Sequence, residues 1–210
     1  MKEDIIQGDC LEVMKGFADN QFDLVLTDPP YGIGMDKEPS KGFGTGGSVG
    51  KYNGDWDSAT PAQEVFDEIV RVGKYTIIFG GQFFTDKLPP NGHWIVWDKK
   101  GAVQFDNPFG DCELAWTNLP KKSVKKYTVI QQGFVSEERD RWHPTQKPVS
   151  LFAQILRDYV KEGDTVLDPF LGSGTTLVAA RSQGLTATGI EISPEYCEIA
   201  RKRLEQDTLL

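Results

Sequence analysis

The chain has 210 residues, of which 39% are hydrophobic and 26% charged, enough for one α/β domain with a modest insertion. No apolar run approaches the roughly 18–20 residues that span a bilayer, so we expect no membrane partner. Three widely spaced cysteines suit a reducing, cytoplasmic compartment and argue against a disulfide framework. The net charge of −8 argues mildly against a nucleic-acid partner, because phosphate neutralisation supplies much of the affinity for DNA.

Strand-like apolar runs alternate with helical patterns along the chain, the order typical of a parallel α/β sheet. Seven strands are predicted, at residues 4–8, 22–27, 75–79, 94–97, 113–117, 165–167 and 187–190, the fifth as an outer one. Helices are predicted from Thr60, as the N-cap, to about Val72, from Pro148 to about Val160, from about Ser173 to Ser182, and from Ser193 to about Leu204.

Two segments interrupt this alternation. Residues 32–57 hold eight glycines and few apolar residues, too long a stretch for an ordinary connection between a strand and a helix. Such a loop is either a functional lid or a disordered linker. Residues 99–142 have poor periodicity and mix basic with aromatic side chains. From 98 to 147 nine Lys and Arg face seven Asp and Glu, so this part is slightly basic within an acidic chain.

A glycine-rich turn lies near the C-terminus, where a predicted strand passes through Asp168, Phe170, Gly172, Ser173 and Gly174 into a helix. Glycines let the backbone approach a ligand. The free N–H groups at the N-terminus of the helix favour the negatively charged end of that ligand. The spacing is not G-x-G-x-x-G and no P-loop lysine follows, which disfavours dehydrogenases and nucleotide triphosphatases.

An acidic residue, Glu191, ends the next strand about twenty residues after the glycine-rich turn. A carboxylate at that place can bind two ribose hydroxyls. The two elements together predict a nucleoside-containing cofactor.

The tetrapeptide Asp28-Pro29-Pro30-Tyr31 directly follows a buried strand. Its prolines stop the strand and fix the backbone, so the Pro29 carbonyl and the Asp28 carboxylate become two rigid acceptors. An exocyclic amine of a base has two N–H donors and a delocalised lone pair. Two acceptors can hold it and let its nitrogen approach tetrahedral geometry, while Tyr31 stacks on a base turned out of the duplex.

These residues resemble the catalytic signature of the DNA amino-methyltransferases, and residues 168–175 resemble the cofactor loop of the same family. The catalytic motif comes first and the cofactor motif last, as in the family's β group. Residues 143–148 resemble the segment that lines the methionine end of the cofactor, and residues 8–10 the element near its adenine. The resemblance covers roughly residues 4–31, 75–98 and 143–204.

The resemblance implies a doubly wound, mostly parallel, seven-stranded Rossmann-like methyltransferase sheet that uses S-adenosylmethionine. Residues 1–98, with a mobile loop at 32–57, and 143–210 form its catalytic and cofactor-binding halves, and 99–142 is an inserted target-recognition segment. The implied catalytic residues are Asp28, Pro29, Pro30 and Tyr31. The implied cofactor-binding residues are Asp9, Cys10, Asp28, His143, Thr145, Lys147, Asp168, Phe170, Gly172, Ser173, Gly174, Thr175, Glu191 and Ile192. No metal and no nucleophilic cysteine are expected.

The expected substrate is double-stranded DNA. In this family Asp at the first position of the tetrapeptide favours N6 of adenine, whereas Ser is commoner in enzymes that methylate N4 of cytosine. Both remain open, as does a non-catalytic binding module of the same fold; methyltransferases of RNA or of protein glutamine usually carry Asn in place of Asp28. Phosphate contacts are expected from Lys121, Lys122, Lys125, Lys126, Arg139 and Arg141, although a solvated charge run explains the lysines equally well. The insert is short and β-group enzymes are often dimers, which favours a homodimer.

Overall fold

The computed structural model describes residues 3–34, 57–102, 110–120, 123–132, 135–136 and 146–206. Its core is one eight-stranded sheet with the order β1-β10-β9-β2-β3-β5-β4-β6. The strands of this sheet are β1 (Glu3–Gln7), β2 (Phe22–Thr27), β3 (Gly73–Phe79), β4 (Trp94–Asp98), β5 (Cys112–Thr117), β6 (Lys125–Thr128), β9 (Thr165–Asp168) and β10 (Thr186–Glu191). A separate pair consists of β7 (Gln131–Gln132) and β8 (Val135–Ser136).

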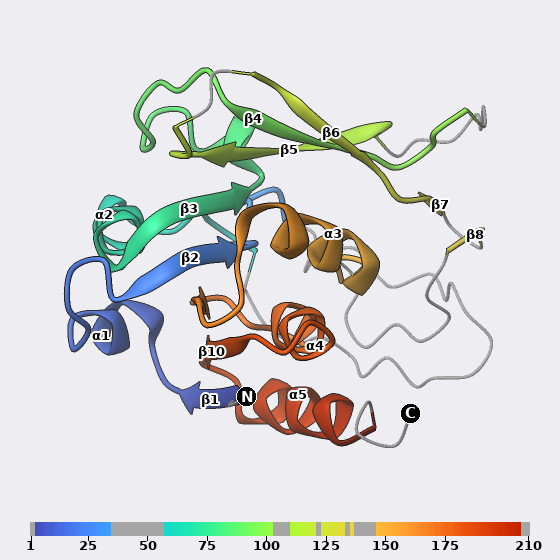
Figure 1. Cartoon of the computed structure of the whole chain (residues 1–210). Coiled ribbons are helices and arrows are strands. Elements are labelled where there is room, and N and C mark those ends of the chain that lie inside the picture. Colours follow the sequence, from blue (N-terminus) through green and yellow to red (C-terminus); the bar gives the residue numbers. More distant parts are fainter. Residues whose placement is uncertain are drawn as a thin grey trace.

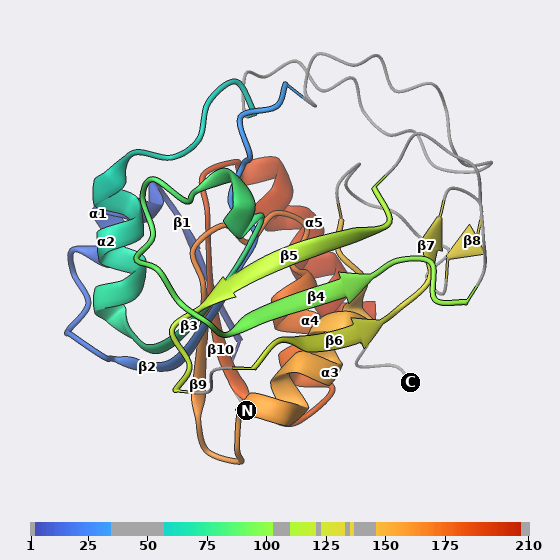
Figure 2. The same ribbon diagram turned by 90° about the horizontal axis from the view of Figure 1, so that it is seen from above.

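Helices cover both faces of the sheet (Figures 1 and 2). One face carries α1 (Cys10–Met14) and α2 (Gln63–Val72), and the other carries α3 (Val149–Tyr159), α4 (Thr175–Arg181) and α5 (Pro194–Gln206). The short 3-10 helix η1 (Gly81–Phe83) follows β3. Successive side chains of a strand point to opposite faces, so β2 contributes Leu24 and Leu26 to the apolar core under α3 and α4, and Val25 to the core under α1 and α2.

The sheet differs in two respects from the predicted one. It has eight strands rather than seven, because β6 pairs in parallel with β4 at the edge. The fifth predicted strand, β5, is not an outer strand: it lies between β3 and β4 and is antiparallel to both. Both β5 and β6 come from residues 99–142, so this segment is joined to the main sheet by two strands.

The helices differ from the prediction in two respects. α2 begins at Gln63 with Ala62 as its N-cap, because the Thr60 hydroxyl accepts a hydrogen bond from the Lys87 ammonium instead of capping the helix. The short helix α1 was not predicted. Its N-cap is Asp9, whose carboxylate accepts a hydrogen bond from the backbone N–H of Glu12 at 3.1 Å.

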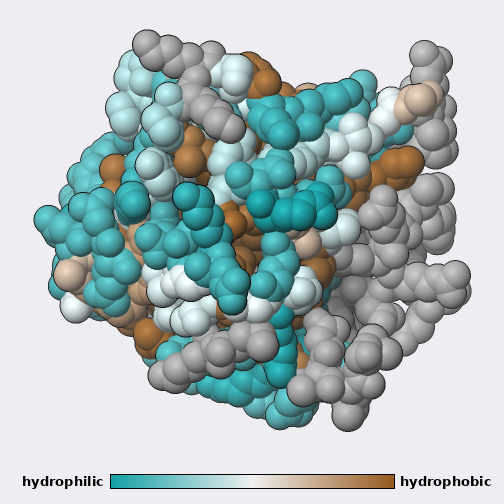
Figure 3. Space-filling view, viewed as in Figure 1, coloured by the Kyte–Doolittle hydropathy of each residue, from teal (hydrophilic) through white to brown (hydrophobic). Residues whose placement is uncertain are grey.

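The face seen in Figure 3 is mostly hydrophilic, and hydrophobic residues show mainly in the gaps near its middle. Exposed large hydrophobic side chains in the described ranges include Ile33 and Phe83, at 52% and 38% exposure. Within the same ranges, no helix is both long and apolar enough to cross a membrane.

Candidate active site

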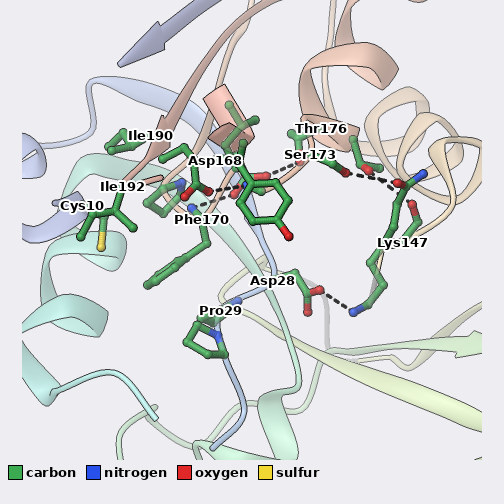
Figure 4. Close-up of a pocket in the computed structure, with 18 of the residues that line it drawn as sticks. Cys10, Asp28, Pro29, Lys147, Asp168, Phe170, Ser173, Thr176, Ile190 and Ile192 are labelled. Atoms are coloured by element: carbon green, nitrogen blue, oxygen red, sulfur yellow. Dashed lines mark hydrogen bonds and ion pairs between the residues drawn. The ribbon is translucent and has the colours of Figure 1, made fainter. Parts of the chain in front are cut away.

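A cavity of about 350 Å³ lies at the carboxyl edge of the parallel strands, within the size range of small-molecule sites. β1, β2, β9 and β10 run in parallel and end at this edge, so the residues that follow them converge there. The cavity is lined by residues 8–10, 28–31, 57, 146–147, 152, 168–173, 175–176, 190–192 and 196. The predicted catalytic tetrapeptide and the predicted cofactor loop therefore line one cavity rather than two separate clefts (Figure 4).

Asp28 follows the last residue of β2 and carries two hydrogen bonds. The Tyr31 hydroxyl donates to Asp28 Oδ1 at 2.5 Å, and Lys147 Nζ donates to Asp28 Oδ2 at 2.5 Å. Lys147 also lies 3.2 Å from the Tyr31 hydroxyl. The resemblance assigned Lys147 to the methionine end of the cofactor, but the structure places its ammonium on the Asp28 carboxylate, the predicted catalytic one.

A second carboxylate, Glu113, stands behind Lys147. Its Oε2 is 3.3 Å from Lys147 Nζ, and its Oε1 pairs with Lys99 Nζ at 2.6 Å. Glu113 is the second residue of β5, and because β5 is antiparallel its beginning lies at the carboxyl edge of its neighbours. It was not predicted as a site residue, since β5 was taken for an outer strand.

Burial and charge act in opposite directions on these groups. Burial raises the pKa of the Asp28 carboxyl above its ordinary value, and the Lys147 ammonium opposes this by favouring the ionised form. Burial acts to lower the pKa of Lys147, but the Asp28 and Glu113 carboxylates raise it above its usual range. For Glu113 burial acts to raise the pKa, and Lys147 followed by Lys99 lowers it. Lys147 is therefore an ammonium held between two carboxylates.

Tyr31 is held by aromatic and backbone contacts around its ring. Its ring stacks on Phe83 with centroids 4.9 Å apart and 23° between the planes. Gly80, which follows β3, has φ +72°, and a Cβ there would lie 2.1 Å from Tyr31 Cε1. A side chain at Gly80 is incompatible with this position of Tyr31, so the glycine supports the site although it does not line the cavity. Sequence reasoning missed it because the contact joins segments about fifty residues apart.

Asp168, the last residue of β9, organises the glycine-rich loop. Its Oδ1 accepts from the Thr27 hydroxyl at 2.8 Å and from the Phe170 backbone N–H at 3.0 Å, and its Oδ2 from the Thr176 hydroxyl at 2.5 Å. These bonds tie β2, the loop and α4 together. Burial raises the Asp168 pKa to about 6 although the hydroxyls of Thr176 and Thr27 oppose the shift.

Glu191 ends β10 and bonds the same loop from the other side. Its Oε2 accepts from the Gly172 N–H and its Oε1 from the Ser193 N–H, both at 2.8 Å. Gly172 has φ +53°, and a Cβ built there meets no heavy atom within 4 Å, so the loop backbone borders open space in the cavity. Each oxygen of Glu191 keeps a second lone pair for a hydroxyl donor. These acceptors fit the ribose hydroxyls of a nucleoside cofactor beside a glycine backbone.

Ser173 is held from two sides, and neither partner was predicted. The Arg203 guanidinium of α5 donates to the Ser173 carbonyl at 2.8 Å and to its Oγ at 2.9 Å. The Ser173 hydroxyl donates to Gln146 Oε1 at 3.2 Å. Gly174 has φ +91°, and a Cβ there would lie 2.8 Å from the Ala200 Cβ, so it permits the close approach of α4 and α5. Among the described residues, it is the predicted cofactor residue that does not line the cavity.

Cys10 and Ile192 line the end of the cavity near β1 and β10 (Figure 4). Burial, with a contribution from the Asp9 charge, raises the pKa of the Cys10 thiol to about 11. The thiol is therefore protonated at neutral pH and suits a contact surface better than a nucleophile.

The ends of the glycine-rich segment 32–57 meet beside the cavity. The Gly32 N–H donates to Asp57 Oδ1 at 2.8 Å, and the Gly34 N–H donates to the Asp57 carbonyl at 3.0 Å. Asp57 is buried and lines the cavity. Gly32, Gly34 and Asp57 are therefore held together beside the site; residues 35–56 lie outside the described part.

Most predicted cofactor residues line this cavity: Asp9, Cys10, Asp28, Lys147, Asp168, Phe170, Gly172, Ser173, Thr175, Glu191 and Ile192. His143 and Thr145 lie outside the described residues, as do the proposed DNA contacts Lys121, Lys122, Arg139 and Arg141. Within the described ranges, no group of three or more His, Cys, Asp or Glu side chains is arranged to hold a metal ion.

The two remaining lysines predicted to contact DNA lie on β6. Lys125 pairs with Asp158 at 3.0 Å, and Lys126 with Asp98 at 3.1 Å. Lys125 begins β6, which is parallel to β4, so it lies toward the amino edge of the sheet, away from the cavity. A phosphate contact from either lysine stays a prediction.

The sequence model of a DNA methylase family, the N6 and N4 amino-methyltransferases, matches residues 88–202, more than half of the chain. The chain belongs to this family. The predicted β-group DNA amino-methyltransferase is therefore confirmed, and with it the predicted class of enzyme.

Known relatives align with nearly the whole length of this chain. The Type II methyltransferase M.HpaI of Haemophilus parainfluenzae is 28% identical, over 99% of this chain and 76% of that protein. The Type II methyltransferase M2.DpnII of Streptococcus pneumoniae is 26% identical, over 97% of this chain and 90% of that protein.

Solved structures share the fold at lower identity. The complex of M1.HpyAVI with S-adenosylmethionine matches with a TM-score of 0.63 and 21% identity, over 97% of this chain and 99% of that one. TTHA0409 of Thermus thermophilus, also in complex with S-adenosylmethionine, matches with a TM-score of 0.62 and 20% identity, over 98% and 96%. The cytosine-N4-specific PvuII methyltransferase matches with a TM-score of 0.64 and 16% identity, over 97% and 86%. The predicted α/β methyltransferase fold is confirmed apart from the number of strands, and S-adenosylmethionine is confirmed as the cofactor at the level of the family.

Proposed function

We propose that this chain transfers the methyl group of S-adenosylmethionine to N6 of an adenine turned out of double-stranded DNA at a specific sequence. The observation that carries the proposal is the single cavity lined by Asp28 and Pro29 on one side and by Gly172 and Glu191 on the other. An amine acceptor and a nucleoside-binding loop in one cavity can bring a target amine and a methyl donor together.

The residues of the tetrapeptide hold the target base. The Asp28 carboxylate and the Pro29 carbonyl accept the two N–H donors of the amine, and the Tyr31 ring offers a stacking surface. The bound cofactor supplies a methyl group on a positively charged sulfur, an electrophile for an in-line displacement. Catalysis is then mainly positioning, with the amine nitrogen about 3–3.5 Å from the methyl carbon. The Asp28 carboxylate can also accept the proton that the methylated amine loses.

The cofactor is held by the elements that end at the same edge. Glu191 accepts hydrogen bonds from the ribose of the cofactor. The backbone of Gly172 and Ser173 borders the rest of the cofactor's chain. Cys10 and Ile192 flank the adenine. Asp168 acts on the cofactor through the loop, because described donors already bond both of its oxygens.

Adenine is favoured over cytosine by Asp28, since Asp is typical of the N6-adenine members of this family and Ser of the N4-cytosine members. Both amines need the same acceptors, so an experiment must distinguish them. Purified protein is incubated with S-adenosylmethionine and mixed-sequence DNA, and the nucleosides are separated by mass spectrometry. N6-methyladenine is the expected product. N4-methylcytosine would overturn the choice of base, and binding of both ligands without a methylated nucleoside would favour a non-catalytic module.

Three further expectations complete the proposal. Residues 1–98 and 143–210 act as the catalytic and cofactor-binding halves of one domain, and residues 99–142 recognise the target while also contributing β5 and β6 to the sheet. The enzyme works in the cytoplasm, and it acts as a homodimer. Light scattering during size-exclusion chromatography, with and without DNA, tests the dimer.

A further inference from the structure

The Lys147 ammonium occupies the Asp28 carboxylate, the acceptor that the proposed target amine needs. This ammonium, like that amine, is a nitrogen with several N–H donors, and it donates to Asp28 Oδ2 at 2.5 Å. The Tyr31 hydroxyl bonds the other oxygen of the same carboxylate. The Lys147 side chain is only 5% exposed, so its charge depends on protein partners rather than on water. Figure 4 shows the Lys147 side chain extending to the Asp28 carboxylate.

Glu113 offers Lys147 a second place to bind. Its Oε2 is 3.3 Å from Lys147 Nζ, close enough for an ion pair, yet it is buried and makes no hydrogen bond of normal geometry among the described residues. Its Oε1 is held by Lys99 at 2.6 Å, which fixes the orientation of the carboxylate. A short movement of the ammonium would exchange the Asp28 bond for a full bond to Glu113 without exposing either charge.

We propose that Glu113 is a positioning residue that draws the Lys147 ammonium away from Asp28 when the target amine enters. Without Glu113, the target amine must displace the Lys147 ammonium from Asp28. The ammonium then has no other carboxylate partner among the described side chains. With Glu113 the exchange keeps Lys147 paired and leaves an Asp28 lone pair free for the amine. The inference rests on the proposed function, because it concerns the same acceptor.

The charges around Asp28 give the proposal a measurable signature. Four groups face Asp28: Tyr31 from the same loop, Lys147 from the segment before α3, Glu113 from β5 and Asp168 from β9. Lys99 lies beyond Glu113. Loss of the Glu113 charge removes a neighbour that hinders ionisation of Asp28, whereas loss of the Lys147 charge removes the one that favours it. The two losses therefore act on the Asp28 carboxyl in opposite directions.

The first test is Glu113→Gln, which keeps the shape of the side chain and removes its charge. We expect single-turnover methyl transfer at saturating S-adenosylmethionine and DNA to slow by about tenfold, the usual scale for losing one charged hydrogen bond. Calorimetric affinity for S-adenosylmethionine should stay within twofold, since Glu113 does not line the cavity. The matched control is Glu68→Gln on α2, which breaks the Glu68–Arg71 ion pair at a similar side-chain exposure, 19% against 20%. It should keep the wild-type rate.

The second test is the pH profile of the same rate. The acid limb should move to lower pH in Glu113→Gln and to higher pH in Lys147→Met, each by about one unit, the usual effect of one charge within 4–6 Å. Glu113→Asp keeps the charge and should keep the wild-type limb. Because its carboxylate is one methylene shorter and so lies farther from Lys147, its rate should still fall, and a wild-type rate in Glu113→Asp would overturn the proposal if Glu113→Gln fails to fold in a circular-dichroism melt.

The outcomes separate this inference from the proposed function. If the wild-type protein methylates no amine of DNA, the proposed function fails. If it does, and Glu113→Gln matches Glu68→Gln in rate and in acid limb, the role of Glu113 alone is overturned. A shift of the acid limb in the same direction for Glu113→Gln and Lys147→Met would also overturn it.

Discussion

The contact between Gly80 and Tyr31 makes a prediction that can be worked out from distances. In Gly80→Ala the new Cβ would lie 2.1 Å from Tyr31 Cε1, 2.6 Å from Cδ1 and 2.7 Å from Cζ. Ordinary contact begins at 3.4 Å, so the ring must move by about 1.3 Å. The stacked Phe83 at 4.9 Å lies against one face of the ring, and the hydroxyl is bonded to Asp28. The movement must therefore disturb the tetrapeptide itself.

A misplacement of about 1 Å in a catalytic site can slow the reaction by about a hundredfold. We expect a loss of this order in single-turnover methyl transfer to DNA. S-adenosylmethionine affinity, measured by calorimetry, should stay within a few-fold because Gly80 does not line the cavity. The left-handed backbone at φ +72° adds a loss of stability of about 1–2 kcal/mol for any residue with a Cβ.

Gly163→Ala separates the two effects. Gly163 also has a positive φ, +91°, but a Cβ there meets no atom within 4 Å, and the residue lies between α3 and β9. It should lose a similar stability in a denaturant titration and keep the wild-type rate. If Gly80→Ala methylates DNA as fast as Gly163→Ala does, then Tyr31 is not held in a catalytic position by Gly80, and the reasoning fails.

Three further predictions test individual carboxylates. Asp28→Ala should abolish methyl transfer while calorimetric affinity for S-adenosylmethionine stays within a few-fold; retained turnover would remove Asp28 from catalysis. Glu191→Ala should weaken S-adenosylmethionine binding by about 1–3 kcal/mol, since two backbone donors and the ribose lose their acceptor, and an unchanged dissociation constant would contradict its role. For Asp168 the native pKa is raised from 3.8 to about 6. Between these pH values the native state binds more protons than the unfolded state. The free energy of unfolding therefore falls as pH rises from about 4 to about 6, by about 3 kcal/mol in all. Urea unfolding at pH 4 and pH 7 should show this loss in the wild-type protein and not in Asp168→Asn. An equal change in the free energy of unfolding in both proteins would show that Asp168 titrates normally.

Strands buried on both faces could be predicted closely from the sequence. β2 coincides with its predicted range, Phe22–Thr27, because an uninterrupted apolar run bounded by polar residues has few alternatives to a central parallel strand. β5 was harder. Its own residues indicate a strand, but its place between β3 and β4 depends on those partners. Glu113 lies at the carboxyl edge only because β5 is antiparallel between β3 and β4, so the residue was missed.

The candidate site was predictable where one short motif carries the chemistry. The tetrapeptide and the glycine-rich turn each combine chain geometry with functional groups within a few residues, and both line the cavity. Partners that meet only in space left no local signal. Lys147 is separated from Asp28 by 119 residues, and Arg203 from Ser173 by 30. A motif could indicate that Lys147 belongs to the site, whereas its actual partner required the fold.

The acidic charge of the chain is a weaker argument against DNA than composition alone suggested. Counting residues treats every carboxylate as a repulsive charge on the surface. Asp28, Asp168 and Glu191 instead bond described donors within the fold and line the cavity, where burial raises the pKa of each. A positively charged sulfonium favours nearby carboxylates and an N–H donor needs acceptors, so carboxylates in this cavity agree with the proposed reaction. Affinity for the phosphates then depends on how Lys and Arg are distributed around the rim of the cavity, which the net charge of the chain does not describe.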